Sequence, residues 1–198
     1  FQGDSVTDAG RDRSNPHDMG EGYPRYASAM IQDSYPDTGF EFVNLGISGT
    51  TLQSKGDSPY TAKDNYTIAR QIEGDIILIA LGTNDSKPAN WNAAAFSRDY
   101  ETMIKELRTG NPKAEIYCLL PVPAYPGNYG IRDSIIRGEV IPAIRKVAGK
   151  AKCRVIDLYT PMKGEGSKVP DKVHPNGAGH AIMAQHIYKA ITGRKMPE

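Results

Sequence analysis

Residues 75–81 (DIILIAL) constrain the fold of this chain more than any other stretch. Nearly every position in it is β-branched or leucine, and a strand that is apolar on both sides needs cover on both sides. The longest apolar run, residues 76–81, is far shorter than the roughly 20 residues that a membrane helix requires. The stretch therefore predicts a central strand in a buried parallel sheet.

Other apolar, strand-like segments alternate with amphipathic, helix-like segments along the chain. We expect the end of a first strand at residues 1–2 and further strands at 40–45, 115–120 and 154–158. Apolar residues at helical spacing predict helices at 23–33, 62–72, 92–108, 133–150 and 177–191, with Pro142 as a kink or break in the fourth. This alternation predicts an α/β protein whose parallel sheet carries helices on both faces.

Length and composition fit one soluble globular domain over residues 1–198. The first strand is nearly absent before Gly3, so we expect it to be truncated and residues to be missing upstream. The net charge of +1 and the lack of a basic cluster argue against a nucleic-acid partner. No signal peptide is visible, and both a cytoplasmic and a secreted location stay open. Cys118 and Cys153 lie in apolar runs and are interpreted as buried hydrophobic residues rather than a disulfide.

Polar residues follow the expected strands at points where they should meet. Ser5, Gly46 and Asn84 each come just after the carboxyl end of a strand, and ligands of such sheets bind beyond those ends. Asp171 and His174 lie in the loop before the last helix, which starts from the same edge. These distant segments are therefore expected to converge on one site.

The chemistry of the converging groups suggests nucleophilic catalysis. A serine hydroxyl needs a base to remove its proton and donors to stabilise the oxyanion that follows. His174 is the candidate base, and Asp171 would fix its tautomer. The backbone N–H groups of Ser5 and Gly46 and the side chain of Asn84 are the candidate oxyanion-hole donors.

Each of these residues has an ordinary structural interpretation when taken alone. Asp4 in the Gly-Asp-Ser turn can cap a helix, Gly46 can serve backbone conformation only, and Asn84 can be a turn residue. Ser48 lies in a segment that approaches the nucleophile-elbow pattern G-x-S-x-G, but Thr50 stands where the second glycine should be. Ser5 is therefore preferred as the nucleophile because it completes a set.

Four motifs together resemble the SGNH hydrolases, also called GDSL esterases and lipases. They are GDSV at 3–6, NLGISG at 44–49, LGTND at 81–85 and DKVHP at 171–175, in the family's order and across nearly the whole chain. The resemblance implies a flavodoxin-like, three-layer α/β/α sandwich with a five-stranded parallel sheet. It also implies Ser5, His174 and Asp171 as the catalytic triad, and Gly46 and Asn84 in the oxyanion hole. Val6 replaces the leucine of the family's name.

The segments LGTNDSKPANW and CLLPVP resemble the corresponding sequences of bacterial carbohydrate O-acetyl esterases. We therefore expect a carboxylic ester hydrolase that acts on short-acyl esters of a carbohydrate or small molecule, with acetyl as the favoured acyl group. We expect it to need no cofactor or metal. Asp4, Trp91, Tyr125 and Tyr129 are the candidate substrate-binding residues, because aromatic side chains with polar tips suit sugar rings. The oligomeric state is left open.

Three other functions remain as alternatives. The first is a lysophospholipase or thioesterase of the same family. The second is a non-catalytic carbohydrate-binding protein that kept the fold. The third is a metal-dependent phosphoesterase, whose candidate ligands are carboxylate, amide and imidazole groups: Asp4, Asp8, Asn84, Asp85 and His174.

Overall fold

The computed structural model describes residues 1–127 and 129–194. Four parallel strands form one sheet in the order β1-β2-β3-β4. Ile79 of β2 pairs with Gln2 on one side and with Cys118 on the other, so β2 is a central strand as its sequence predicts. The strands are β1 (Gln2–Gly3), β2 (Ile76–Ala80), β3 (Glu115–Leu119) and β4 (Arg154–Ile156).

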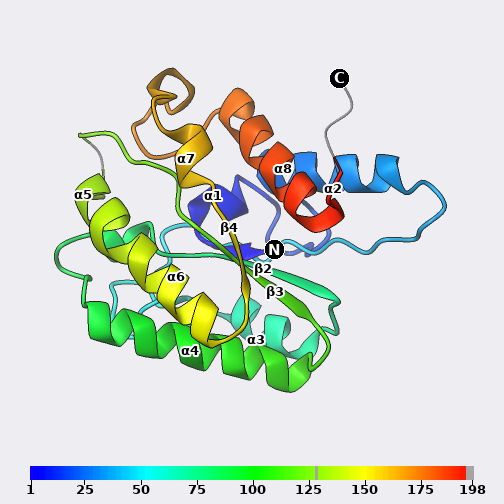
Figure 1. Cartoon of the computed structure of the whole chain (residues 1–198), viewed down its shortest axis with the longest axis horizontal. Helices are drawn as coiled ribbons and strands as arrows, with labels where there is room; N and C mark the ends of the chain where they lie inside the picture. The colour runs from blue at the N-terminus through cyan, green and yellow to red at the C-terminus, as the bar shows by residue number, and fades with distance from the viewer. Residues whose placement is uncertain (128, 195–198) are drawn as a thin grey trace.

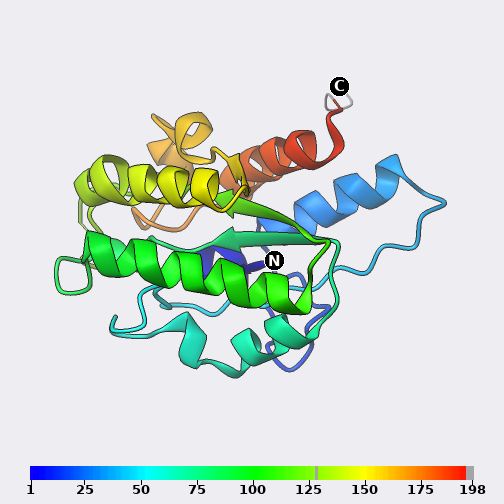
Figure 2. The ribbon, with the colours of Figure 1, turned by 60° about the horizontal axis from the view of Figure 1, so that its bottom comes forward.

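Helices cover both faces of the sheet and confirm the three-layer α/β/α arrangement (Figures 1 and 2). One face carries α3 (Asp64–Gln71), α4 (Ala93–Gly110) and α6 (Ile141–Lys150), and the other carries α2 (Tyr23–Ser34) and α8 (Gly177–Thr192). Shorter helices lie in the connections: α1 (Ser5–Asp8), α5 (Asp133–Ile135), α7 (Tyr159–Met162) and single 3₁₀ turns at Tyr60–Ala62, Asn84–Ser86 and Gly166–Lys168.

The side chains of β2 divide between two hydrophobic cores. Ile77 and Ile79 join the core under α3, α4 and α6, whereas Leu78 joins the core under α2 and α8. Successive strand residues point to opposite faces, so a strand covered on both faces must be apolar at every position. This is the physical reason for the continuous apolar run that the sequence shows.

Helix α4 forms where helical spacing and a cap coincide. Asn92 accepts the Ala95 N–H at 2.9 Å and thereby satisfies one free amide of the first turn. The side chains that face the sheet are all buried: Phe96, Tyr100, Met103, Ile104 and Leu107. The predicted helix over 92–108 is therefore confirmed, and its apolar side packs on the sheet.

The fifth predicted strand, residues 40–45, is not a strand in the structure. Residues 43–47 nevertheless run beside β1, because Phe1 donates to the Val43 carbonyl at 2.7 Å and Leu45 and Ile47 donate to Phe1 and Gly3. The Leu45 carbonyl accepts instead from side chains, Tyr60 at 2.9 Å and Asn65 at 3.2 Å, which breaks the regular ladder. The segment occupies the place of a fifth strand without the regular hydrogen bonding of one.

The predicted helix over 133–150 is interrupted before its proline. A π-helical turn at Ile136–Val140 separates α5 from α6, and Pro142 stands in the first turn of α6. Proline has no N–H to donate to the preceding turn, so the regular hydrogen-bond pattern cannot pass through it. The interrupted hydrogen-bond pattern next to Pro142 agrees with the kink or break expected there.

Both cysteines are free thiols. Cys118 is buried in β3 and Cys153 is half-buried before β4, as the apolar interpretation predicts. Within the described ranges, no helix is both long enough and apolar enough to span a bilayer.

Candidate active site

Ser5 begins a four-residue helix, α1, directly after β1. Asp4 caps this helix, because its carboxylate accepts the Val6 N–H at 3.0 Å. Asp4 is only 1% exposed, and burial raises the pKa of its carboxyl to about 6. The cap fixes the first residue of the helix, and the Ser5 N–H has no hydrogen-bond partner among the described residues.

His174 approaches Ser5 from the loop before α8. Its Nε2 lies 2.7 Å from Ser5 Oγ, and its Nδ1 lies 2.6 Å from Asp171 Oδ2. An ionised carboxylate only accepts, so Nδ1 carries the proton and Nε2 is left to accept from the Ser5 hydroxyl. The three side chains form one continuous hydrogen-bonded chain.

Asp171 is held in place by the backbone as well as by the imidazole. Its Oδ1 accepts the N–H groups of His174 at 2.7 Å and Val173 at 3.0 Å. Partial burial would raise the pKa of Asp171, but these hydrogen bonds and the His174 ring outweigh it and lower the pKa to about 2. The carboxylate therefore stays ionised throughout the range in which histidine titrates.

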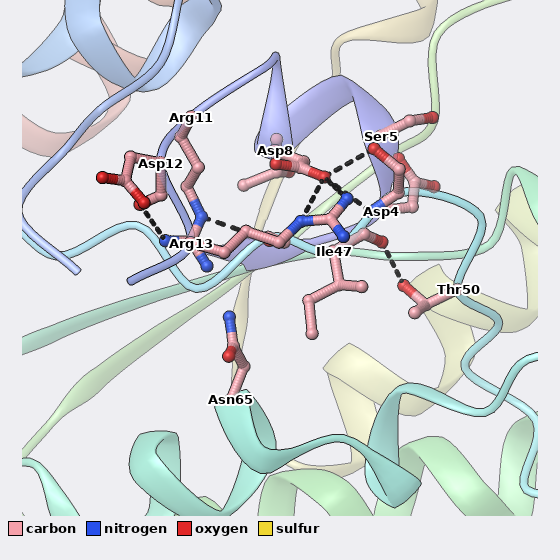
Figure 3. A network of polar contacts seen from close by, with 12 residues as sticks. Asp4, Ser5, Asp8, Arg11, Asp12, Arg13, Ile47, Thr50 and Asn65 are labelled. Carbon is pink, nitrogen blue, oxygen red and sulfur yellow. Dashed lines mark hydrogen bonds and ion pairs between the residues drawn. The ribbon is translucent and has the colours of Figure 1, made fainter. Parts of the chain in front are cut away.

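A tight turn at residues 47–50 lies next to α1. The Ile47 carbonyl accepts from the Thr50 N–H at 3.4 Å and from the Thr50 hydroxyl at 2.8 Å, as Figure 3 shows for the hydroxyl. Gly49 has φ +81°, the value that a type II turn requires at its third residue. The central amide of such a turn is not used inside the turn, and the Gly49 N–H has no partner among the described residues.

Asn84 joins the same turn from the end of β2. Its Nδ2 donates to the Thr50 carbonyl at 3.0 Å, which leaves its second N–H hydrogen without a partner in the described part of the chain. The next residue, Asp85, is fully buried and accepts the N–H groups of Leu52 at 2.9 Å and Gln53 at 2.8 Å. The LGTND motif therefore holds the loop after residue 50 at the sheet edge.

Gly46 has a different environment from the one expected for an oxyanion-hole donor. Its N–H donates to Asn44 Oδ1 at 3.0 Å and is therefore already engaged. A Cβ at this position would come within 2.4 Å of the Asp8 backbone nitrogen, so the absence of a side chain lets the segment lie against α1. The Gly46 amide is thus engaged and its position is closely packed, whereas the Gly49 N–H has no partner among the described residues.

Among the candidate substrate-binding residues, Tyr129 presents an exposed side chain against His174 and Asp171. The Tyr129 ring packs edge-on against His174 with centroids 5.5 Å apart, and its hydroxyl donates to Asp171 at 3.4 Å. Tyr129 is 60% exposed and adopts φ +57°, an uncommon conformation for a tyrosine. Its exposed ring stands at the mouth of the site.

The other candidate contacts are occupied in packing. Trp91 donates to Glu139 at 2.6 Å, and Tyr125 donates to the Met162 carbonyl at 3.2 Å. Tyr125 also supports the loop before His174, because its N–H donates to the Lys172 carbonyl at 2.8 Å. The prediction that Asp4 contacts the substrate is not supported either, because its side chain is buried as a helix cap.

Two of the carboxylates proposed as metal ligands, Asp8 and Asp85, bind donors elsewhere in the chain. Asp8 accepts from Ser48 and Arg13, and both oxygens of Asp85 accept backbone amides. Within residues 1–127 and 129–194, no group of three or more His, Cys, Asp or Glu side chains is arranged to hold an ion. The donor set therefore does not fit the metal-dependent alternative.

Two parts of the site were missed from the sequence. Gly49 lies in the NLGISG motif, but glycine spacing alone does not say which amide is left free after folding. Asp8 and Ser48 meet across 40 residues of sequence, and no local pattern signals that contact. The one available hint was Gly49 itself, because a Ser-Gly pair after a strand is a common sign of a turn.

Comparison with known proteins defines the class of this protein. Residues 1–182 match the GDSL-like lipase/acylhydrolase family, and the chain belongs to that family. The resemblance carried by the four motifs is thus confirmed.

Two curated relatives and one solved structure show which members of the family this chain is similar to. An acetylxylan esterase from Xylanibacter ruminicola is 35% identical over 189 residues, which cover 86% of this chain but only 38% of that protein. An acetylxylan esterase from Geobacillus stearothermophilus is 25% identical over 207 residues, covering 96% of this chain and 92% of the relative. The crystal structure of Axe2, an acetylxylan esterase from Geobacillus stearothermophilus, matches with a TM-score of 0.77 at 24% identity over 97% of this chain and 92% of Axe2, which shows the shared fold.

Proposed function

We propose that this protein is a serine esterase that removes acetyl groups from a carbohydrate through an acyl-enzyme. The observation that carries the proposal is the hydrogen-bonded chain from Ser5 through His174 to Asp171. Family membership and the acetylxylan esterase relatives support the ester class and the acetyl group. Together they favour this function over the other hydrolases considered.

The proposed reaction begins with proton transfer. His174 Nε2 takes the Ser5 proton as Ser5 Oγ attacks the ester carbonyl, and Asp171 stabilises the imidazolium that forms. The tetrahedral intermediate collapses, and His174 gives its proton to the departing sugar hydroxyl. Water then attacks the acetyl-serine with His174 again as base, which releases acetate and restores Ser5.

The oxyanion in each half-reaction needs donors that are free before substrate arrives. Ser5 and Gly49 offer backbone N–H groups without partners among the described residues, and Asn84 offers the second hydrogen of its amide. Fixed donors of this kind stabilise charge without having to reorient during the reaction. In this proposal Gly49 takes the place that the sequence assigned to Gly46.

The carbohydrate side of the substrate is proposed from two observations. Two of the curated relatives are named as acetylxylan esterases. Tyr129 exposes an aromatic ring beside His174, and such rings favour stacking against the apolar face of a sugar. An acetylated xylan is therefore the substrate to test first.

The test compares two esters under identical conditions. We expect acetate release from acetylated xylan to exceed fatty-acid release from a lysolipid, and Ser5→Ala to abolish both. Faster lysolipid cleavage would favour a lysophospholipase instead. Activity that survives Ser5→Ala would contradict the assignment of Ser5 as the nucleophile. The absence of labelling by a fluorophosphonate probe would instead favour a non-catalytic binding protein.

A further inference from the structure

Asp8 is a buried carboxylate that the proposed reaction does not use. It is 2% exposed, and one of its oxygens, Oδ2, accepts from both the N–H of Ser48 at 2.8 Å and the hydroxyl of Ser48 at 2.5 Å. The same oxygen accepts from Arg13, with Nε at 3.2 Å and with Nη2 (Figure 3). A single buried oxygen therefore gathers donors from two segments of the chain.

The donors around Asp8 favour its charged form. Burial alone would raise the pKa of this carboxyl, but the hydrogen bonds from Arg13 and Ser48 outweigh burial and place the pKa below its ordinary value. Hydrogen bonds to an ionised acceptor are about twice as strong as those between neutral groups. The contact between Asp8 and Ser48 is thus a firm attachment rather than an incidental one.

This attachment joins two parts of the proposed site. Asp8 and Ser5 lie on the same short helix, α1, so their relative positions are fixed by the backbone. Ser48 directly precedes Gly49 in the turn at residues 47–50. On its far side the turn is held by Asn84, which donates to the Thr50 carbonyl at 3.0 Å.

We infer that Asp8 is a positioning residue, which fixes the Gly49 amide relative to Ser5 by anchoring Ser48 to α1. The inference rests on the proposed function, in which Gly49 stabilises the oxyanion. Arg13 assists because its guanidinium orients the carboxylate and compensates its charge. Asp8 touches neither substrate nor reacting atoms and acts only through the turn.

The test measures kcat and KM separately on p-nitrophenyl acetate. Asp8→Asn should lower kcat about tenfold and leave KM nearly unchanged, since a donor aimed at the oxyanion acts in the transition state only. The effect should be smaller than the roughly 10²–10³-fold loss expected when an oxyanion donor is removed outright. Rates are expressed per active site, counted by the end point of fluorophosphonate labelling, so that partly unfolded protein does not contribute.

A matched control lies in the loop that follows α1. Asp12 also accepts the N–H and hydroxyl of a serine, Ser14, at 2.9 and 2.7 Å, but it is exposed, and among the described residues it makes no hydrogen bond to the turn at residues 47–50. Asp12→Asn should keep the wild-type kcat. Ser48→Ala removes only one of the two serine donors, and it gives a second, milder variant if Asp8→Asn folds poorly.

The double variant separates positioning from a general structural effect. If Asp8 acts through Ser48, Asp8→Asn combined with Ser48→Ala should lose little more kcat than Asp8→Asn alone. Fully additive losses, or an unchanged kcat in Asp8→Asn, would overturn the inference while wild-type activity still upheld the esterase. An inactive wild type would instead remove the proposed function itself.

Discussion

Ser5 and His174 lie 169 residues apart in the sequence, yet Ser5 Oγ is 2.7 Å from His174 Nε2. The contact exists because β1 and the loop before α8 open onto the same edge of the sheet. Asp171 accepts from the other ring nitrogen at 2.6 Å and so determines which nitrogen faces the serine.

Asp171→Asn is expected to turn the imidazole into an unproductive tautomer. The amide would donate towards Nδ1, so Nε2 would carry the proton and could not accept one from Ser5. We expect kcat to fall by about 10³–10⁴-fold with a small change in KM. The measurement is steady-state kinetics on p-nitrophenyl acetate, and a loss below about tenfold would show that Asp171 does not control the tautomer.

Asn84→Ala should remove a donor from the oxyanion hole and also release the Thr50 carbonyl. The expected loss in kcat is about 10²–10³-fold with a modest change in KM. Asn84→Asp keeps the shape of the side chain but removes its N–H groups, so it should be similarly impaired near neutral pH. A nearly normal kcat in the aspartate variant would contradict a donor role for this residue.

Gly46 and Gly49 should respond differently to alanine. Gly46→Ala places a methyl group 2.4 Å from the Asp8 backbone nitrogen, so it should lower the melting temperature and the yield of folded protein. Gly49→Ala meets open space but strains a residue with φ +81°, at a cost of about 1–2 kcal/mol. We expect Gly49→Ala to lower kcat per active site more than it lowers the yield of folded protein. Thermal unfolding together with active-site titration separates the two, and a reversed pattern would return the oxyanion role to Gly46.

His180 should make the fold sensitive to acid. It is buried in α8, where its Nδ1 accepts the Tyr23 N–H at 3.1 Å, and burial followed by the nearby charge of His174 lowers its pKa to about 4. Between that value and the ordinary pKa of about 6.5, the unfolded chain binds a proton that the folded protein does not. The contribution of neutral His180 to the free energy of unfolding is therefore fully present above pH ~6.5. It is lost as the pH falls towards 4, by an amount of order 3 kcal/mol.

The variant His180→Asn can keep an acceptor for Tyr23 but has no group that titrates. Its melting temperature should fall less than that of the wild type between pH 7 and pH 4.5. His186→Asn is the control, because His186 is an exposed residue of the same helix. Equal acid sensitivity in wild type and His180→Asn would assign the loss of stability to other groups.

Much of the fold was predictable because the signals were local. The continuous apolar run at residues 76–81 is satisfied by a strand covered on both faces, and the helical spacing in α4 shows directly which side of the helix is buried. Strand ends then place Ser5 and Asn84 at one edge through topology alone. The strand predicted at residues 40–45 does not form a regular ladder. Its Leu45 carbonyl accepts hydrogen bonds from the side chains of Tyr60 and Asn65, which lie later in the chain.

The differences between the site expected from the sequence and the site proposed from the structure have one physical origin. The sequence shows which residues carry donors, but it does not show which donors are already engaged. Asn44 folds back onto the Gly46 amide, and Glu139 takes the indole N–H of Trp91. The first contact spans two residues and the second spans 48, and residue type fixes neither of them. Residue type alone therefore favoured Gly46 over Gly49, and it did not show that the Trp91 indole is already engaged.

The segment at residues 43–47 also forms the outer edge of the sheet beside β1. An unpaired strand border offers amides and carbonyls to any other chain and is a common starting point for aggregation. Here Asn44 donates its N–H to the Pro16 carbonyl at 2.8 Å, and the Gly46 carbonyl accepts from Arg11 at 3.2 Å. The loop that follows α1 thus shields these groups, and it discourages sheet-to-sheet association between molecules.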